Sequence, residues 1–231
     1  MTTTLDHTDS RTTQLAAEAD HRPAPVLQLL GAACMAAAPL LFLGGAATSP
    51  PQEDGSSRAY IDSLGNDPFL TGLSANLFHY SWVAFAFAAL AAIGLVRGRR
   101  GRALTLVGGL AAAFGSIQFT GLLYSDWVLA ALDNELTMDQ AVAVFDSING
   151  APSVAVWLLT AKVFGLLGFP VLFAGLARAG VLSWWLVPLS LLPMVAFGVI
   201  GGIAGMAAGL VCYAPNFLVA ARLVQRARLA R

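Results

Sequence analysis

Long apolar segments separated by short polar ones dominate the chain between residues 26 and 222. An α-helix rises about 1.5 Å per residue, so about 20 apolar residues cross the roughly 30 Å of hydrocarbon in a bilayer. The final apolar run, 182–221, is about twice that length and contains the pair Gly201-Gly202, where a hairpin turn would fit. The pattern therefore predicts six membrane-spanning helices at 26–48, 75–96, 103–129, 153–177, 182–201 and 203–222.

The composition favours a membrane-embedded chain. Hydrophobic residues make up 57% of the sequence and charged residues 11%, whereas about a quarter of the residues in a soluble domain are charged. Residues 1–25 are polar and rich in Thr and Asp, which predicts a disordered tail. Residues 223–231 form a short basic tail. The predicted fold class is an all-α, polytopic membrane helix bundle at 26–222.

Loop charges orient this bundle. Arginines cluster between spans 2 and 3 and after span 6, and Arg178 lies between spans 4 and 5. These three sets share one side only if the number of spans is even. Positive charge in short loops marks the cytoplasmic side. We therefore expect the bundle to lie in the plasma membrane with both the N and the C terminus in the cytoplasm. The acidic residues of the opposite side are Glu53, Asp54, Asp62, Asp67, Asp133, Glu135, Asp139 and Asp146.

Small residues repeat at three- or four-residue spacing in two of the predicted spans. Because lipid gives helices no hydrophobic reason to pair, such faces let two backbones approach closely. They would pack within the bundle or between two copies of it. The repeats are Gly108, Ala112 and Gly115 in span 3, and Gly201, Gly205 and Gly209 near the start of span 6.

Lys162 is the only lysine of the chain and lies inside span 4, roughly 13 Å from its outer end. A charge at that depth must reach the surface or find a partner. Asp126, at the outer end of span 3, is the candidate partner, and His79 lies one turn inside span 2 on the same side. The outer half also carries Asn76, Tyr80, Gln118, Tyr124 and Ser125.

These residues predict an outward-facing polar pocket in which Lys162 and Asp126 form an ion pair and His79 titrates near neutral pH. The alternative is structural: the ion pair ties spans 3 and 4 together and His79 sits at the membrane interface. Thr137 and Gln140 have the spacing of a capping box. They predict an amphipathic helix that covers the helix ends or acts as a lid over the pocket.

Metal, cofactor and nucleic-acid chemistry have no support in the sequence. Cys34 and Cys212 lie in apolar runs, and no Cys/His spacing indicates a metal site. We therefore expect no metal and no cofactor. The formal net charge is zero and no extended basic patch exists, so nucleic acid is not an expected partner. The expected partners are the lipid bilayer, a second copy of the chain, or another membrane protein.

Short motifs suggest a relationship. They are Tyr60-Ile61-Asp62-Ser63-Leu64 before Asp67-Pro68, Leu77-Phe78-His79, Arg99-Arg100-Gly101-Arg102, Gly121-Leu122-Leu123-Tyr124-Ser125-Asp126, and Gly180-Val181-Leu182-Ser183-Trp184-Trp185-Leu186. With these motifs the chain resembles the six-helix bacterial membrane proteins grouped as the DUF4386 family and their actinobacterial relatives. The resemblance implies a fold and a membrane location, and it supplies no catalytic residues.

The sequence leaves three functions open. The first is a non-enzymatic membrane protein that acts as a scaffold, a partner subunit or a lipophile-binding protein. The second is a small membrane enzyme acting on an apolar, isoprenoid or lipid substrate, with His79 or Asp126 as acid/base and Lys162 as an electrostatic anchor. The third is a small transporter, which requires a route on the cytoplasmic side, such as a cavity lined by Tyr213 and Asn216.

Overall fold

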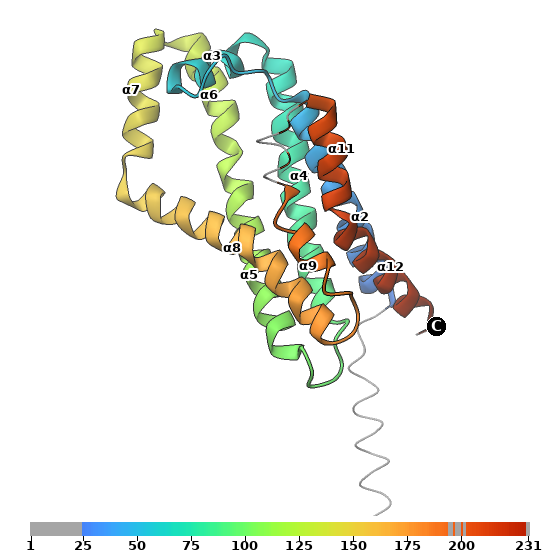
Figure 1. Cartoon of the computed structure of the whole chain (residues 1–231). Coiled ribbons are helices and arrows are strands. Elements are labelled where there is room, and N and C mark those ends of the chain that lie inside the picture. The colour runs from blue at the N-terminus through green and yellow to red at the C-terminus, as the bar shows by residue number, and fades with distance from the viewer. Residues whose placement is uncertain (1–24, 194–195, 197–199, 201, 230–231) are drawn as a thin grey trace, which may run out of the picture.

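The computed structural model describes residues 25–193, 196, 200 and 202–229, and every regular element within them is an α-helix. The apolar runs form the long helices, and the polar loops carry the short ones (Figure 1). In chain order the helices are α2 (Pro25–Thr48), α3 (Ser57–Asn66), α4 (Pro68–Ile93), α5 (Arg102–Leu122), α6 (Tyr124–Glu135), α7 (Met138–Asn149), α8 (Pro152–Arg178), α9 (Leu186–Leu189), α11 (Gly202–Cys212) and α12 (Ala214–Leu229).

Four helical segments among the described residues are long and apolar enough to cross a membrane: Pro25–Thr48, Pro68–Ile93, Arg102–Glu135 and Pro152–Arg178. The pair α11 and α12, bent by 43°, adds a fifth if it is one broken span. The bend precedes Pro215 by two residues, and proline at that place removes a backbone donor and crowds the carbonyl one turn earlier. The prediction of a helical membrane bundle holds at this level.

Two predicted boundaries differ in the structure, and local capping explains the first of them. α4 begins at Pro68 instead of residue 75, since the Asp67 side chain accepts a hydrogen bond of 2.9 Å from the Leu70 backbone nitrogen. The third predicted span continues through a break at Leu123 into α6 and ends at Glu135. Both extensions lie at the same end of the bundle, next to α3 and α7 (Figure 1).

The last predicted hairpin is the main departure from the sequence interpretation. The described part of the span expected at 182–201 is not one continuous helix, because only Leu186–Leu189 is helical before residue 193. Pro188 and Pro193 each lack the backbone N–H that a continuous helix needs there. Residues 194–195, 197–199 and 201 lie outside the described part of the chain. The count of six spans therefore stays a prediction.

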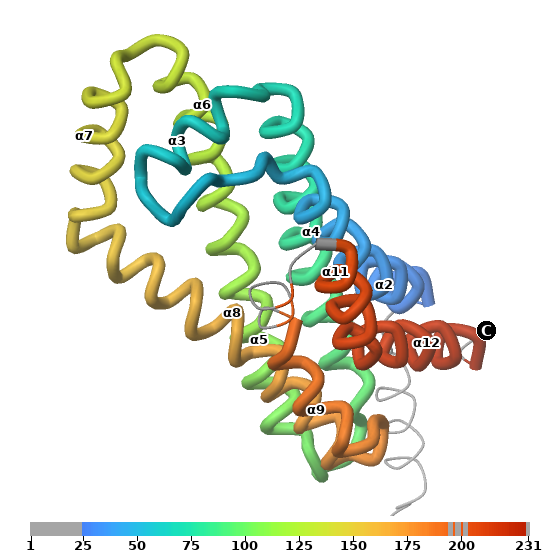
Figure 2. The backbone as a smooth tube through the Cα atoms, turned by 45° about the horizontal axis from the view of Figure 1, so that its top comes forward, coloured from blue at the N-terminus to red at the C-terminus, as the bar shows by residue number. Residues whose placement is uncertain are grey.

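The long helices lie side by side in the order α12, α2, α4, α5 and α8. Figure 2 shows α12 beside α2 at one edge of this series and α8 against α5 at the other. The loop between α4 and α5, which carries Arg97, Arg99 and Arg100, lies at one end of the bundle, together with the end of α8. Helices α3, α6 and α7 gather at the other end (Figure 1). We call these the arginine end and the acidic end.

Helices α5 and α8 pack backbone against backbone. A methyl group at Gly108 would lie 2.2 Å from the Leu172 nitrogen, and one at Gly115 would lie 2.1 Å from the Gly165 nitrogen. Ala112, between them, is fully buried. The small-residue face predicted for span 3 thus lies against α8 of the same chain. Of the second predicted face, Gly205 and Gly209 are buried, and Gly201 lies outside the described residues.

Candidate functional site

Asp126 lies near the beginning of α6 and binds a side chain from a different loop. The Tyr60 hydroxyl of α3 donates a hydrogen bond of 2.6 Å to the Asp126 carboxylate. Burial, together with the charge and the hydrogen bond of Asp126, raises the pKa of the Tyr60 hydroxyl above its ordinary range. Ile61 and Leu64 of α3 pack with Leu129 of α6 beneath this contact. The contact therefore fastens α3 onto α6.

The amphipathic helix predicted after Thr137 is α7. The Thr137 backbone nitrogen donates a hydrogen bond of 3.1 Å to the Gln140 side chain, as the capping-box spacing predicts. Arg58 of α3 forms an ion pair with Asp139 of α7, and the Ser57 hydroxyl donates a hydrogen bond of 2.9 Å to Asp146. Helices α3, α6 and α7 thus form one assembly at the acidic end.

The other residues of the predicted outward pocket point to separate places. The Asn76 side chain donates to the Gly72 carbonyl of its own helix, 2.7 Å away. His79 is half-buried and packs edge-on against the ring of Tyr80, which is itself 58% exposed. Tyr124 is 67% exposed, and the Ser125 hydroxyl donates to the Leu122 carbonyl one turn back. The two main cavities between the described helices are lined by residues other than these.

Gln118 joins two helices. Its side-chain nitrogen donates a hydrogen bond of 2.8 Å to the Thr160 hydroxyl of α8, and that hydroxyl donates to the Trp157 carbonyl. Lys162 lies on the same helix but is exposed, and within the described residues it makes neither a hydrogen bond nor an ion pair. Among the described residues the predicted pairing of Lys162 with Asp126 is not formed; the partner of Asp126 is Tyr60.

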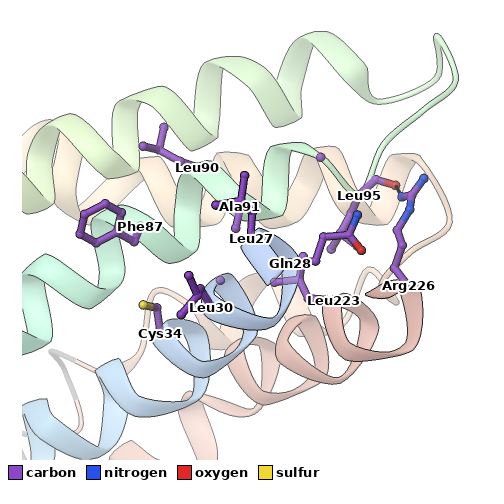
Figure 3. A pocket seen from close by; sticks show the side chains of 12 residues that line it. Leu27, Gln28, Leu30, Cys34, Phe87, Leu90, Ala91, Leu95, Leu223 and Arg226 are labelled. Carbon is purple, nitrogen blue, oxygen red and sulfur yellow. Dashed lines mark hydrogen bonds between the residues drawn. The ribbon is translucent and has the colours of Figure 1, made fainter. Parts of the chain in front are cut away.

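A large cavity lies at the arginine end, between α2, α4 and α12 (Figure 3). Its volume is about 560 Å³. The lining is mostly aliphatic and aromatic, and it includes Leu30 of α2, Phe87 and Leu90 of α4, and Leu223 of α12. Half-buried Cys34 also contributes its thiol. We call this cavity, together with Gln28 and Arg226 in its lining, the α2–α12 groove.

Two polar side chains lie together at one end of the α2–α12 groove. Gln28 is buried, and its side-chain oxygen has no hydrogen-bond partner among the residues that the structure describes. The Arg226 guanidinium donates to the Leu95 carbonyl at the end of α4, 2.5 Å away. Figure 3 shows Gln28, Leu95 and Arg226 at this end, and Cys34 and Phe87 at the other. The groove is therefore amphipathic along its length.

A second cavity of about 310 Å³ lies between α4, α8, α12 and the segment 190–193. Trp82, Phe85 and Phe169 supply aromatic walls, and Tyr213 and Asn216 supply polar groups. The Asn216 side-chain nitrogen lies 3.4 Å from the Met35 sulfur. Tyr213 and Asn216 are the two residues that the transport hypothesis required to line a cavity.

The sequence carried a weak signal for the α2–α12 groove. Gln28 is an amide in the first turns of an otherwise apolar run, and a buried amide in a membrane helix calls for a partner. Arg226 had no signal of its own, because it is one of several terminal arginines. Only the packing of α12 against α2 and α4 distinguishes Arg226 from Arg222 and Arg228.

Within the described residues, no group of three His, Cys, Asp or Glu side chains is arranged to hold a metal ion. Comparison of the chain with protein-family models, with curated proteins and with solved structures found no match.

Proposed function

We propose that this protein is a multi-pass membrane protein that binds an anionic lipid, without transforming it, in the α2–α12 groove. The lipid chain lies along α2 and α4, and the headgroup lies at Gln28 and Arg226. The observation that carries the proposal is the combination of an apolar cavity with an arginine and a buried amide oxygen, unpartnered among the described residues, at one end.

The size and lining of the groove suit an acyl chain. Small-molecule sites occupy about 300–1,000 Å³ and are mostly apolar, with a few polar groups that set the orientation; the groove, at about 560 Å³, lies within that range. Phe87 of α4 and Leu95, two residues beyond the end of α4, lie near opposite ends of the groove; the six residues from Phe87 to Ile93 correspond to roughly 9 Å of helix. The groove therefore extends from the arginine end toward the middle of the bundle.

The polar end suits a phosphate that carries a hydroxylated group. An arginine has five N–H donors, and the bond to the Leu95 carbonyl uses one of them. The remaining donors and the Gln28 amide nitrogen can serve phosphate oxygens. The unpartnered Gln28 oxygen requires a donor, which a headgroup hydroxyl supplies and a choline headgroup does not. This favours a phosphatidylglycerol-type lipid.

The proposal includes the six-span topology with both termini in the cytoplasm of a bacterial cell. The gathering of the arginine-bearing loops at one end of the bundle supports it. The groove then opens in the cytoplasmic leaflet of the plasma membrane. The expectation of six helices also rests on the resemblance of the sequence motifs to the DUF4386 family.

Native mass spectrometry of the full-length protein tests the proposal. The protein is released from vesicles that contain equal amounts of phosphatidylcholine and phosphatidylglycerol. We expect phosphatidylglycerol to be retained preferentially. Arg226→Gln and Gln28→Leu should each lower that preference, about tenfold for a lost charge-assisted contact of about 1.5 kcal/mol.

Arg222→Gln is the matched control, because Arg222 lies one turn before Arg226 on α12, is exposed and bonds to Gln225. Equal retention of the two lipids, or an equal loss of preference in the Arg222 and Arg226 variants, would contradict a specific headgroup site. Slower alkylation of Cys34 in phosphatidylglycerol vesicles provides an independent readout, since Cys34 lines the same groove.

Transport is the second candidate, because Tyr213 and Asn216 line the second cavity. Its aromatic walls favour a small, mostly apolar solute that accepts a hydrogen bond from Asn216. Asn216→Leu should then abolish solute flux into vesicles while leaving phosphatidylglycerol retention unchanged. Unchanged flux in that variant excludes the second cavity as the route.

A further inference from the structure

Lys162 occupies an unusual place on α8. Its neighbour Ala161 is buried, as are Gly165 and Gly168, and these three form the side of α8 that faces α5. Lys162 lies about 100° around the helix from Ala161, beyond the edge of that buried side. The surface of α8 beside Lys162 is apolar, with Leu159 62% and Val163 42% exposed, whereas Leu166 borders the second cavity.

This surface lies inside a helical segment that is long and apolar enough to cross a membrane. Lys162 is ten residues from the first residue of α8, Pro152, which corresponds to roughly 15 Å of helix. Pro152–Arg178 is long and apolar enough to cross the hydrocarbon core, which is about 30 Å thick, although α8 runs obliquely to α4 and α5 (Figure 1). Ionisable groups at such depth normally face a bundle interior, a water-filled cavity or a charged partner. Lys162 instead lies on an outer surface of α8.

The chain itself contains no suitable partner. Between residues 68 and 125, and again from residue 147 to the end, the sequence has no Asp or Glu. Asp126, the acidic residue nearest to the hydrocarbon, is hydrogen-bonded to Tyr60. A second copy of the chain would bring the same set of groups. The counter-charge for Lys162 must therefore come from a different molecule.

We propose that Lys162, with Leu159 and Val163, forms a docking surface for a transmembrane helix of another protein that carries an aspartate or glutamate near its middle. An ammonium and a carboxylate that pair in hydrocarbon relieve the cost of burying each charge alone. The apolar neighbours provide packing, which is a main source of helix association in lipid. This surface and the α2–α12 groove lie at opposite edges of the helix series, so either can exist without the other.

A designed peptide tests the proposal directly. The full-length protein is placed in phosphatidylcholine vesicles with a leucine–alanine transmembrane peptide that carries one central aspartate, and association is measured by energy transfer. The reference peptide has leucine at that position. We expect the aspartate peptide to associate at least about tenfold more strongly, as for a coupling of about 1.4 kcal/mol. Lys162→Met should remove the difference, and Lys162→Arg should retain it.

Arg178→Met is the control, since Arg178 is an exposed cation at the arginine end of the same helix. It should preserve the preference for the aspartate peptide. Because Lys162 is the only lysine, a membrane-permeant amine reagent labels it and the N-terminus alone, and the aspartate peptide should slow labelling of Lys162. Equal association of the two peptides, or a preference that survives Lys162→Met, overturns the proposal. So does protection of Lys162 by phosphatidylglycerol without any preference for the aspartate peptide.

Discussion

Gly115 offers a test of how closely α5 and α8 approach, on which the position of α8 depends. A methyl group added there would lie 2.1 Å from the Gly165 nitrogen and 2.4 Å from its α-carbon. These are backbone atoms that no rotamer change can move. Gly115→Ala must therefore push the two helices apart by about 0.9 Å, to the 3.0 Å below which such contacts essentially never fall.

The size of the effect follows from that displacement. A gap of about 0.5–1 Å forfeits a quarter to a half of the dispersion energy of each contact along the interface. Overpacking of this kind typically costs about 1–3 kcal/mol. Replacing a helical glycine by alanine otherwise gains up to about 1 kcal/mol. Gly115→Ala is thus expected to reverse the ordinary sign of the substitution.

Reversible unfolding by a denaturing detergent in mixed micelles, followed by helical circular dichroism, measures this effect. Gly72→Ala in α4 is the matched control, because its methyl group would find the Trp127 ring nitrogen no closer than 3.8 Å. We expect Gly72→Ala to be neutral or stabilising, and Gly115→Ala to raise the unfolded fraction about tenfold for each 1.4 kcal/mol lost. A Gly115→Ala protein as stable as the parent would refute the close α5–α8 packing.

Two further substitutions probe the polar contacts. Tyr60→Phe leaves the Asp126 carboxylate without its donor and should loosen α3 from α6 by about 1.5–3 kcal/mol, seen as faster hydrogen exchange in α3. The raised pKa of Tyr60 means that the folded state favours the neutral hydroxyl. The difference in free energy of unfolding between the parent and Tyr60→Phe should therefore have its full size below about pH 10 and shrink above it. A constant difference across that range argues against the contact. Gln28→Leu removes a buried oxygen that has no partner and should stabilise the lipid-free protein by about 1–3 kcal/mol while weakening lipid retention. A loss of stability in lipid-free micelles would show that Gln28 is already satisfied.

The sequence was sufficient for the long helices and several of their ends. Runs such as 26–48 and 153–177 are apolar enough and long enough for a helix that crosses a membrane, and α2 and α8 match them closely. Local chemistry also predicted the capping pair Thr137 and Gln140 at the start of α7. These features depend on residues that are near one another in the chain, so hydropathy, length and capping are enough to predict them.

Tertiary packing decided everything that depends on distant segments. The hydrogen bond from Tyr60 to Asp126 joins residues 66 positions apart, and it takes the carboxylate that the sequence suggested for Lys162. The α2–α12 groove requires the ends of three helices to meet, and it alone makes Arg226 different from the other terminal arginines. Hydropathy reports how deeply a helix can enter a membrane, but it does not report which side of the helix faces its neighbours. For this reason the sequence by itself determined that the chain forms apolar helices with basic and acidic connecting segments. Only the three-dimensional packing decided which polar side chains are paired, which are exposed, and where a cavity remains.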